Sequence, residues 1–162
     1  MQDIYDQTVA YILENQENFY RLAYSYVHNR EAALDVVQNA ICKALEKCNT
    51  LRNPDALKTW LYRILVNEAI QHLRNTRREA ELTDAVLDRL VYEEPRYDGD
   101  GGVYQQVLRL SEPIKTVIIL RYYEDLTLKE IAEVTGTNLS TVKTRLYSGL
   151  QKLKKNWKEQ DV

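Results

Sequence analysis

The sequence predicts an all-α protein: two small helical domains joined by a flexible acidic linker, the C-terminal one containing a helix-turn-helix. The 162 residues include only five glycines and three prolines, too few for the many turns of a β-sandwich or barrel. Apolar residues recur at helical spacing on both sides of a polar segment that holds three of the five glycines. A chain of this length suffices for one ordinary domain or two small ones.

The first domain is expected over residues 1–78, as three or four helices. Apolar residues recur at intervals of three and four before and after two breaks. One break falls at Asn29, and the other at residues 49–54, where a proline disfavours helix in the residue before it. A last helix is expected from Asp55 to about Arg78.

The linker is expected over residues 79–102. It carries 8 acidic and 2 basic residues, whereas residues 51–78 and 134–162 each carry 6 basic and 2 acidic residues. Two basic islands flanking an acidic segment are the charge pattern expected of a protein that contacts the phosphates of one nucleic acid at two places. A solvated helix face is the alternative explanation for either island.

The second domain is expected over residues 103–162. Helical spacing runs through its first eight residues, and Ser111 followed by Pro113 marks the start of a second helix. Thr127 and Glu130 have the spacing of a capping box, in which each side chain accepts a hydrogen bond from the other residue's backbone amide. A third helix therefore starts at this point.

A helix-turn-helix is predicted next. Gly136 suits the tight turn because glycine adopts the left-handed conformation at little cost, and Asn138 or Ser140 is placed to cap the following helix. The buried stripe of that helix is expected to be Val142, Leu146 and either Leu150 or Leu153. Its opposite face carries hydroxyls and cations, which suit base edges and phosphates. A solvated basic helix in a simple helical hairpin is the alternative.

Nothing in the sequence indicates an enzyme or a cofactor. His28 and His72 are far apart and are interpreted as surface or packing residues, and no nucleophile, phosphate-binding or metal-ligand motif is present in the sequence. Cys42 and Cys48 lie six residues apart on one expected helix, on opposite faces, so we expect buried thiols without a disulfide. We therefore expect a binding protein with no cofactor and no metal.

The sequence also predicts a cytoplasmic protein. It contains no run of about 18 apolar residues. Its first residues, Met-Gln-Asp-Ile-Tyr-Asp, lack the basic and apolar segments of a signal peptide.

Several segments resemble the conserved regions of bacterial RNA polymerase sigma factors. Residues 17–39, which include Asp-Val-Val-Gln, and residues 59–67, Thr-Trp-Leu-Tyr-Arg-Ile-Leu-Val-Asn, are similar to the second region. Residues 110–123, 126–132 and 141–146 are similar to the fourth. Both regions in this order, with a short connection, resemble the compact extracytoplasmic-function (ECF) group. The resemblance covers roughly residues 10 to 155.

The resemblance implies a surface for core RNA polymerase. The clamp helices of the largest polymerase subunit would contact Asp35, Val37, Gln38 and Asn39, and the flap of the second-largest subunit would contact the fourth region. Asn39 departs from the family, which often has an acidic residue at this position. The apolar residues Val37, Ile41 and Leu120 are open to two interpretations, as a partner surface or as core.

The resemblance also implies two DNA-binding surfaces. The minus-ten element and its melted strand would contact Asn49, Arg52, Asn53, Lys58, Arg63, Asn67, Arg74 and Arg78. The minus-thirty-five element would contact Ser140, Thr141, Lys143, Thr144, Arg145, Tyr147 and Ser148. Within these sets Arg145 is interpreted as a phosphate-binding or structural residue. Trp60, beside the first set, is expected to lie mainly in the core.

The function implied is promoter recognition, DNA melting and transcription initiation at stress-response genes, by a subunit that is monomeric when free. An anti-sigma factor, often membrane-anchored, is the further partner implied. The acidic linker is open to two interpretations, a nucleic-acid mimic in the RNA path or a solubilising tether. Two other functions compete: a conventional dimeric helix-turn-helix regulator that binds duplex operators, and a helical adaptor without a DNA role.

Overall fold

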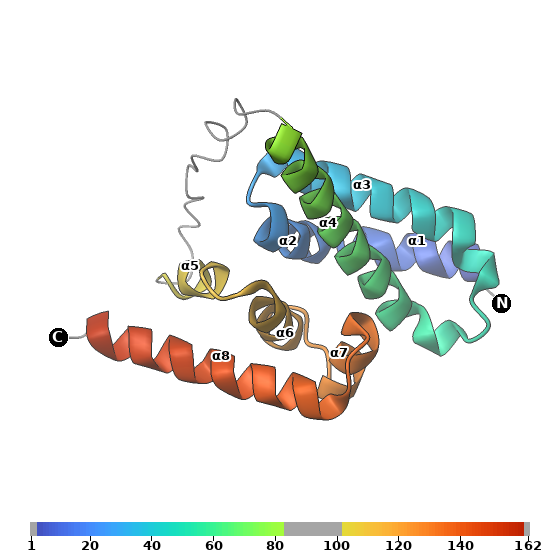
Figure 1. Ribbon diagram of the computed structural model, residues 1–162. Coiled ribbons are helices and arrows are strands. Elements are labelled where there is room, and N and C mark those ends of the chain that lie inside the picture. Colours follow the sequence, from blue (N-terminus) through green and yellow to red (C-terminus); the bar gives the residue numbers. More distant parts are fainter. Residues whose placement is uncertain (1–2, 83–101, 161–162) are drawn as a thin grey trace. The chain divides into compact units, whose positions relative to one another are not determined.

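The computed structural model is all-helical (Figure 1). It describes residues 3–82 and 102–160, and within these ranges no strand occurs. The chain divides into two compact units, Met1–Pro95 and Arg96–Val162, which we call the N-terminal and C-terminal units. The predicted all-α fold with two helical domains is confirmed. Most of the predicted linker, residues 83–101, lies outside the described residues.

Over residues 3–82, the N-terminal unit consists of four α-helices and two short 3₁₀ turns. In chain order they are α1 (Ile4–Glu14), α2 (Gln16–Val27), α3 (Arg30–Lys47), η1 (Cys48–Thr50), η2 (Pro54–Ala56) and α4 (Leu57–Leu82). The last helix therefore continues four residues beyond the end expected at Arg78.

Short polar side chains define the boundaries of these helices. Asp3 caps α1 by accepting a hydrogen bond from the Asp6 amide at 2.8 Å, and Asn29 caps α3 by accepting one from the Ala32 amide at 3.0 Å. Between α2 and α3, His28 has a left-handed backbone with φ 52°. The break predicted at Asn29 is thus confirmed, and its cause is a left-handed residue followed by a cap.

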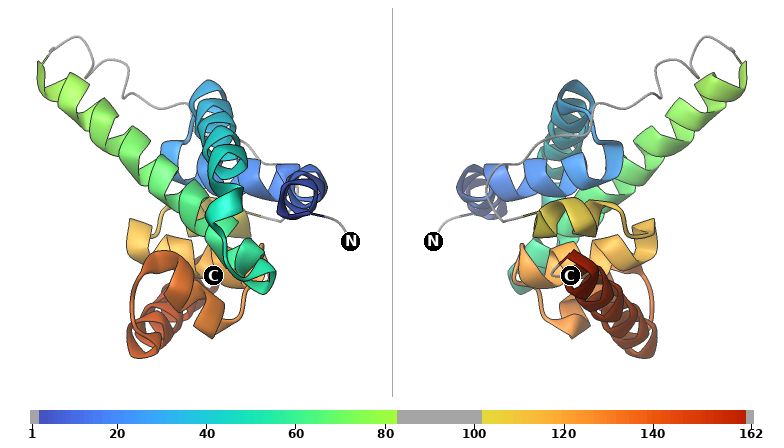
Figure 2. Two further views of the ribbon diagram at one scale, coloured as in Figure 1. Left: turned by 90° about the vertical axis from the view of Figure 1, so that its right-hand side faces the viewer. Right: turned by 90° about the vertical axis from the view of Figure 1, so that its left-hand side faces the viewer.

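The core of the N-terminal unit forms where α2, α3 and α4 pack on one another. Leu22, Val36, Tyr62 and Leu65 are at most 2% exposed. The rings of Phe19 and Tyr62 meet edge to face, with centroids 5.3 Å apart, which is a favourable arrangement for aromatic pairs. The distal turns of α4 project past the other helices of the unit (Figure 2), so one end of this helix is presented to solvent.

The C-terminal unit contains α5 (Val103–Leu108), α6 (Glu112–Tyr122), α7 (Leu128–Thr135) and α8 (Leu139–Gln160). The capping box is confirmed: the Thr127 hydroxyl accepts from the Glu130 amide at 3.1 Å, and the Glu130 carboxylate accepts from the Thr127 amide at 2.8 Å. Gly136 ends α7 with φ 67°. Asn138 caps α8 by accepting from the Thr141 amide at 2.8 Å, so Asn138 rather than Ser140 has this role.

Ser111 precedes α6 as predicted, with Pro113 in the first turn. Its side chain makes no capping hydrogen bond, so the start of α6 depends on the proline and on packing. Leu120 is fully buried in this helix and belongs to the core, which removes it from the candidate partner surfaces.

The buried stripe predicted for α8 is confirmed, and the structure decides between its two alternatives. Val142 is fully buried, Leu146 and Leu153 are half-buried, and Leu150 is 39% exposed, so Leu153 and not Leu150 continues the stripe. Gly149 is buried between them, and a Cβ atom there would lie 2.9 Å from side-chain atoms of Ile114 and of Ile118. The missing side chain therefore lets α8 approach α6 closely.

One further prediction needs correction. Cys48 is buried as expected, but Cys42 is exposed, because the six-residue spacing turns the two thiols to opposite faces. Trp60, expected mainly in the core, is partly buried. Within the described ranges, no helix is both long enough and apolar enough to cross a membrane.

Candidate nucleic-acid interface

The first three turns of α8 carry a polar, exposed face. Ser140, Lys143, Thr144 and Tyr147 are all exposed and lie within an arc of about 100° around the helix axis. Tyr147 is 66% exposed, the largest value among the exposed apolar and aromatic side chains described. This face is opposite to Val142, which anchors the helix in the core.

The remaining predicted residues of α8 lie to one side of this face, between Thr144 and the buried Val142. Thr141, Arg145 and Ser148 are half-buried. The Thr144 hydroxyl donates a hydrogen bond to the Ser140 carbonyl at 3.0 Å, which orients that side chain on the helix. The N-terminal half of α8 therefore offers hydroxyls and one ammonium group to the major groove, in the manner of a recognition helix.

A second basic face lies on α4. Arg63, Asn67, Arg74 and Arg78 are exposed and fall within an arc of about 60°, along about 22 Å of the helix. Their buried counterparts on the opposite side include Leu65 and Ala69. Arg74 and Arg78 both belong to the C-terminal half of α4. A row of cations on one side of a helix suits a nucleic-acid backbone.

The segment between α3 and α4 supplies the other residues predicted for this surface. Asn49 and Arg52 are exposed, whereas Lys58 is half-buried at the start of α4. The Asn53 side chain accepts a hydrogen bond from the Asp55 amide at 3.0 Å. Asn53 therefore shapes the turn before α4 through its side-chain oxygen.

The polymerase-binding residues predicted on α3 separate into two groups. Asp35, Gln38 and Asn39 are exposed and form one strip, to which Cys42 also belongs. The thiol of Cys42 is a member that the sequence interpretation missed, because the residue was assigned to the core. Exposed acidic residues Glu31 and Glu46 extend the same strip, which gives it a negative charge.

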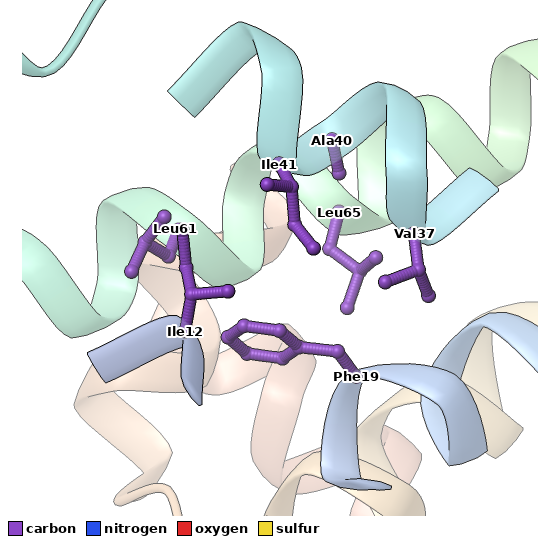
Figure 3. A pocket seen from close by; sticks show the side chains of 7 residues that line it. All are labelled: Ile12, Phe19, Val37, Ala40, Ile41, Leu61 and Leu65. Atoms are coloured by element: carbon purple, nitrogen blue, oxygen red, sulfur yellow. The ribbon is translucent and has the colours of Figure 1, made fainter. Parts of the chain in front are cut away.

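Val37 has a different position from these three residues. It is half-buried and lines an apolar hollow between the helices of the N-terminal unit (Figure 3). The lining residues are Ile12, Phe19, Val37, Ala40, Ile41, Leu61 and Leu65. Val37 and Ile41 thus point toward Phe19 and contribute to packing.

Charged groups in the interior do not add to the two exposed faces. Glu68 of α4 is almost buried and forms an ion pair with Lys43 of α3, which joins the two helices. Lys115 of α6 is buried, and desolvation lowers the pKa of its amine below the ordinary value. The nearby Glu112 carboxylate opposes this shift but is the smaller effect. Among the described residues no cluster of histidine, cysteine, aspartate and glutamate could hold a metal ion.

The two faces define a class of protein, a DNA-binding protein with two recognition units. One unit has a helix-turn-helix with a polar recognition face, and the other has a row of cations along an extended helix. Comparison with known proteins identifies the family. Residues 11–79 match sigma-70 region 2, and residues 102–153 match sigma-70, region 4.

Curated relatives agree with this assignment. The chain is 42% identical over 154 residues to the RNA polymerase sigma factor SigV of Bacillus subtilis (strain 168). The aligned residues cover 95% of this chain and 93% of that protein. It is 28% identical to the ECF RNA polymerase sigma factor SigW of the same organism, over 89% of this chain and 85% of that protein. The chain belongs to the sigma-70 family of RNA polymerase sigma factors, in the ECF group.

Solved structures share the fold. The sigma factor RpoE from Bartonella quintana, solved in complex with the anti-sigma factor NepR, has a TM-score of 0.78 at 24% identity, over 92% of this chain and 95% of that chain. CnrH in complex with the cytosolic domain of CnrY has a TM-score of 0.68 at 22% identity, over 94% of this chain and 88% of that chain.

Membership of the family establishes the function at the level of the whole protein. As a sigma factor, the chain binds core RNA polymerase and promoter DNA and directs transcription initiation. Both regions are present in one chain, which disfavours a conventional dimeric regulator. Sigma factors are initiation factors, and the family provides no support for an independent enzymatic activity.

Proposed function

We propose that the two units divide promoter recognition between duplex and melted DNA. In this proposal α8 reads the minus-thirty-five element as duplex, and α4 with the preceding loop holds the melted minus-ten strand. The observation that carries the proposal is the pair of separate exposed faces, polar and hydroxyl-rich on α8, and cationic over about 22 Å of α4.

The chemistry of α8 supports duplex reading. Lys143 can donate to guanine in the major groove, and the short side chains of Ser140 and Thr144 reach base edges. Arg145 is half-buried and lies closer around the helix to Val142 than to the polar face, a position that suits a phosphate contact or a structural role. The N-terminal half of a recognition helix is the part that approaches bases.

The chemistry of α4 and the preceding loop supports capture of a separated strand. Unstacking bases costs a few kcal/mol each, so the open strand needs contacts that the duplex does not make. Arg63, Arg74 and Arg78 supply phosphate contacts, and Asn49 with Asn67 supplies hydrogen-bonding groups for exposed bases.

We also propose that the acidic strip of α3 docks on the clamp helices of the largest polymerase subunit, and the C-terminal unit on the flap. Asp35, Gln38 and Asn39 are exposed together on that strip, which supports a polar interface with a basic partner. Replacing Asp35 with arginine should weaken binding to core polymerase, whereas replacing Cys42 with serine, on the same strip, should change it little.

On the ECF resemblance alone, we propose that the promoters belong to stress-response genes and that an anti-sigma factor, often membrane-anchored in this group, controls the protein in the cytoplasm. The sigma factors of similar fold that were solved with NepR or with CnrY are consistent with such a partner. An anti-sigma factor that covers the α3 strip would compete with core polymerase for it.

In vitro transcription tests the central proposal. Genomic DNA fragments are transcribed by core polymerase with and without this protein, and the RNA starts are mapped. Discrete starts should occur only with the protein. They should disappear in the Lys143→Ala/Thr144→Ala variant and persist in the control variant Lys154→Ala, which removes a cation further along the same helix.

The opposite result would be no new starts together with tight operator binding by the protein alone. That outcome would indicate a duplex-binding regulator and would refute the division proposed for the two units.

A further inference from the structure

The first turn of α8 carries an exposed apolar residue beside its polar face. Leu139 is the first residue of the helix and is 37% exposed. It lies about 40° from Lys143 around the helix axis. Leu139 therefore borders the face that we propose to read the minus-thirty-five element, at the end of the helix that approaches bases.

A leucine in the major groove has few possible partners. The base edges there present hydrogen-bond donors and acceptors, and only thymine adds an apolar group, its C5 methyl. Leu139 has no polar side-chain atom, so its side chain cannot form hydrogen bonds with the donors and acceptors of the bases. Contact with a methyl group removes apolar surface of both partners from water and is favourable.

The neighbouring polar groups fix the conformation of this turn. The Asn138 side chain accepts from the Thr141 amide at 2.8 Å, and the Thr144 hydroxyl donates to the Ser140 carbonyl at 3.0 Å. Both bonds hold the backbone on either side of Leu139. Because this turn is already ordered, little conformational entropy is lost when Leu139 contacts a methyl group, so the contact can contribute to binding.

We propose that Leu139 is a specificity-determining residue that contacts the C5 methyl group of a thymine in the minus-thirty-five element. This inference rests on the proposed role of α8. It adds a determinant outside the polar set, which selects an A·T pair at one position by apolar contact rather than by hydrogen bonding.

Replacement of thymine by deoxyuridine tests the contact at a single group, because it removes the methyl and keeps every donor and acceptor. Holoenzyme with the wild-type protein first selects its preferred element from a promoter library randomised over the minus-thirty-five region. Each thymine of that element is then replaced in turn. At one position the wild-type holoenzyme should lose about fourfold in promoter affinity, the value of one buried methyl group.

The same replacement should have no effect on holoenzyme with the Leu139→Ala variant. Leu150→Ala is the matched control, since Leu150 is 39% exposed on the same helix, about 16 Å further along the axis. This control should keep the fourfold effect. Alanine is a good helix former, so both variants should fold.

Three results would overturn the inference: an equal uracil effect in the wild type and in Leu139→Ala, no uracil effect at any thymine, or a selected element without an A·T pair. The proposed role of α8 fails separately. If the selection returns no preferred element, and Lys143→Ala/Thr144→Ala changes nothing, then α8 does not read the promoter and both proposals are wrong. A strong preferred element without a uracil effect would refute only the role of Leu139.

Discussion

The two units present their proposed DNA-binding residues in different ways. In the C-terminal unit the residues occupy consecutive turns of one helix, between a capping asparagine and the close crossing at Gly149. In the N-terminal unit they come from a 3₁₀ turn, a loop and a long stretch of α4. One face is therefore set by local structure, and the other depends on how the bundle arranges separate segments.

In the proposed division of roles, this difference corresponds to two kinds of DNA. A duplex has a regular groove, which a single short helix can fill. A melted strand has no fixed groove, so it needs a longer surface with many phosphate contacts. Substitutions in each unit therefore test that contrast.

Replacing Arg63, Arg74 and Arg78 together with alanine should weaken the binding of single-stranded DNA by the N-terminal unit. Loss of three phosphate contacts should lower the salt slope of single-strand binding by about 2 and reduce the affinity of holoenzyme for a minus-ten strand by about a hundredfold. The measurement is binding of a labelled non-template oligonucleotide over a range of salt concentrations. Arg30→Ala, at an exposed arginine that begins α3, is the control. An unchanged salt slope in the triple variant would exclude α4 from the interface.

Gly149→Ala should destabilise the C-terminal unit by about 1–3 kcal/mol, because the new methyl group would overlap Ile114 and Ile118 at 2.9 Å. In an ordinary helix interior the same change stabilises by about 0.5–1 kcal/mol. The sign of the change in unfolding free energy, measured by urea denaturation, therefore reports the close approach. A gain in stability would show that α8 and α6 are not in close contact at this position.

Removing a helix cap should affect only the unit that contains it. Thr127→Ala removes the capping box of α7 and Asn29→Ala removes the cap of α3, each at a cost of about 1 kcal/mol. Hydrogen exchange should show faster exchange of amides in the mutated unit and unchanged exchange in the other. Equal acceleration in both units would mean that they unfold as one cooperative body.

Glu68→Gln should have the smallest effect. It removes the ion pair with Lys43, whose side chain is half exposed, so water screens much of the attraction. We expect a loss of at most about 1 kcal/mol in the N-terminal unit, which thermal unfolding at low and high salt would detect as a difference that shrinks with salt. A loss that does not depend on salt would indicate packing rather than charge.

The sequence predicted more of the C-terminal unit than of the N-terminal one. The capping box, the turn at Gly136 and the polar face of α8 follow from signals within a few residues, and the structure contains each of them. Helical spacing alone did not decide whether Leu150 or Leu153 belongs to the buried stripe of α8, because it does not show that α6 lies close to Gly149. That information comes only from the neighbouring helix.

In the N-terminal unit the periodicity indicated helices but not their exposed faces. Cys42 was assigned to the core from residue type, whereas its place on α3 exposes it. Val37 was left open as a partner-surface or a core residue, and the structure shows it half-buried and lining the apolar hollow. Both depend on which side of α3 the other helices cover, and a single sequence contains no direct signal for that choice.

Transcription from a promoter whose minus-ten region is already melted tests the division between the units most directly. Mismatches in that region remove the unstacking cost of a few kcal/mol per base. The measured quantity is the transcript yield of each variant relative to wild type on the same template. Between the intact and the melted promoter, this ratio should rise at least about tenfold for the triple arginine variant. For Lys143→Ala/Thr144→Ala it should change less than about threefold. Equal recovery of both variants, or recovery of the α8 variant alone, would contradict the assignment of duplex reading to α8 and strand capture to α4.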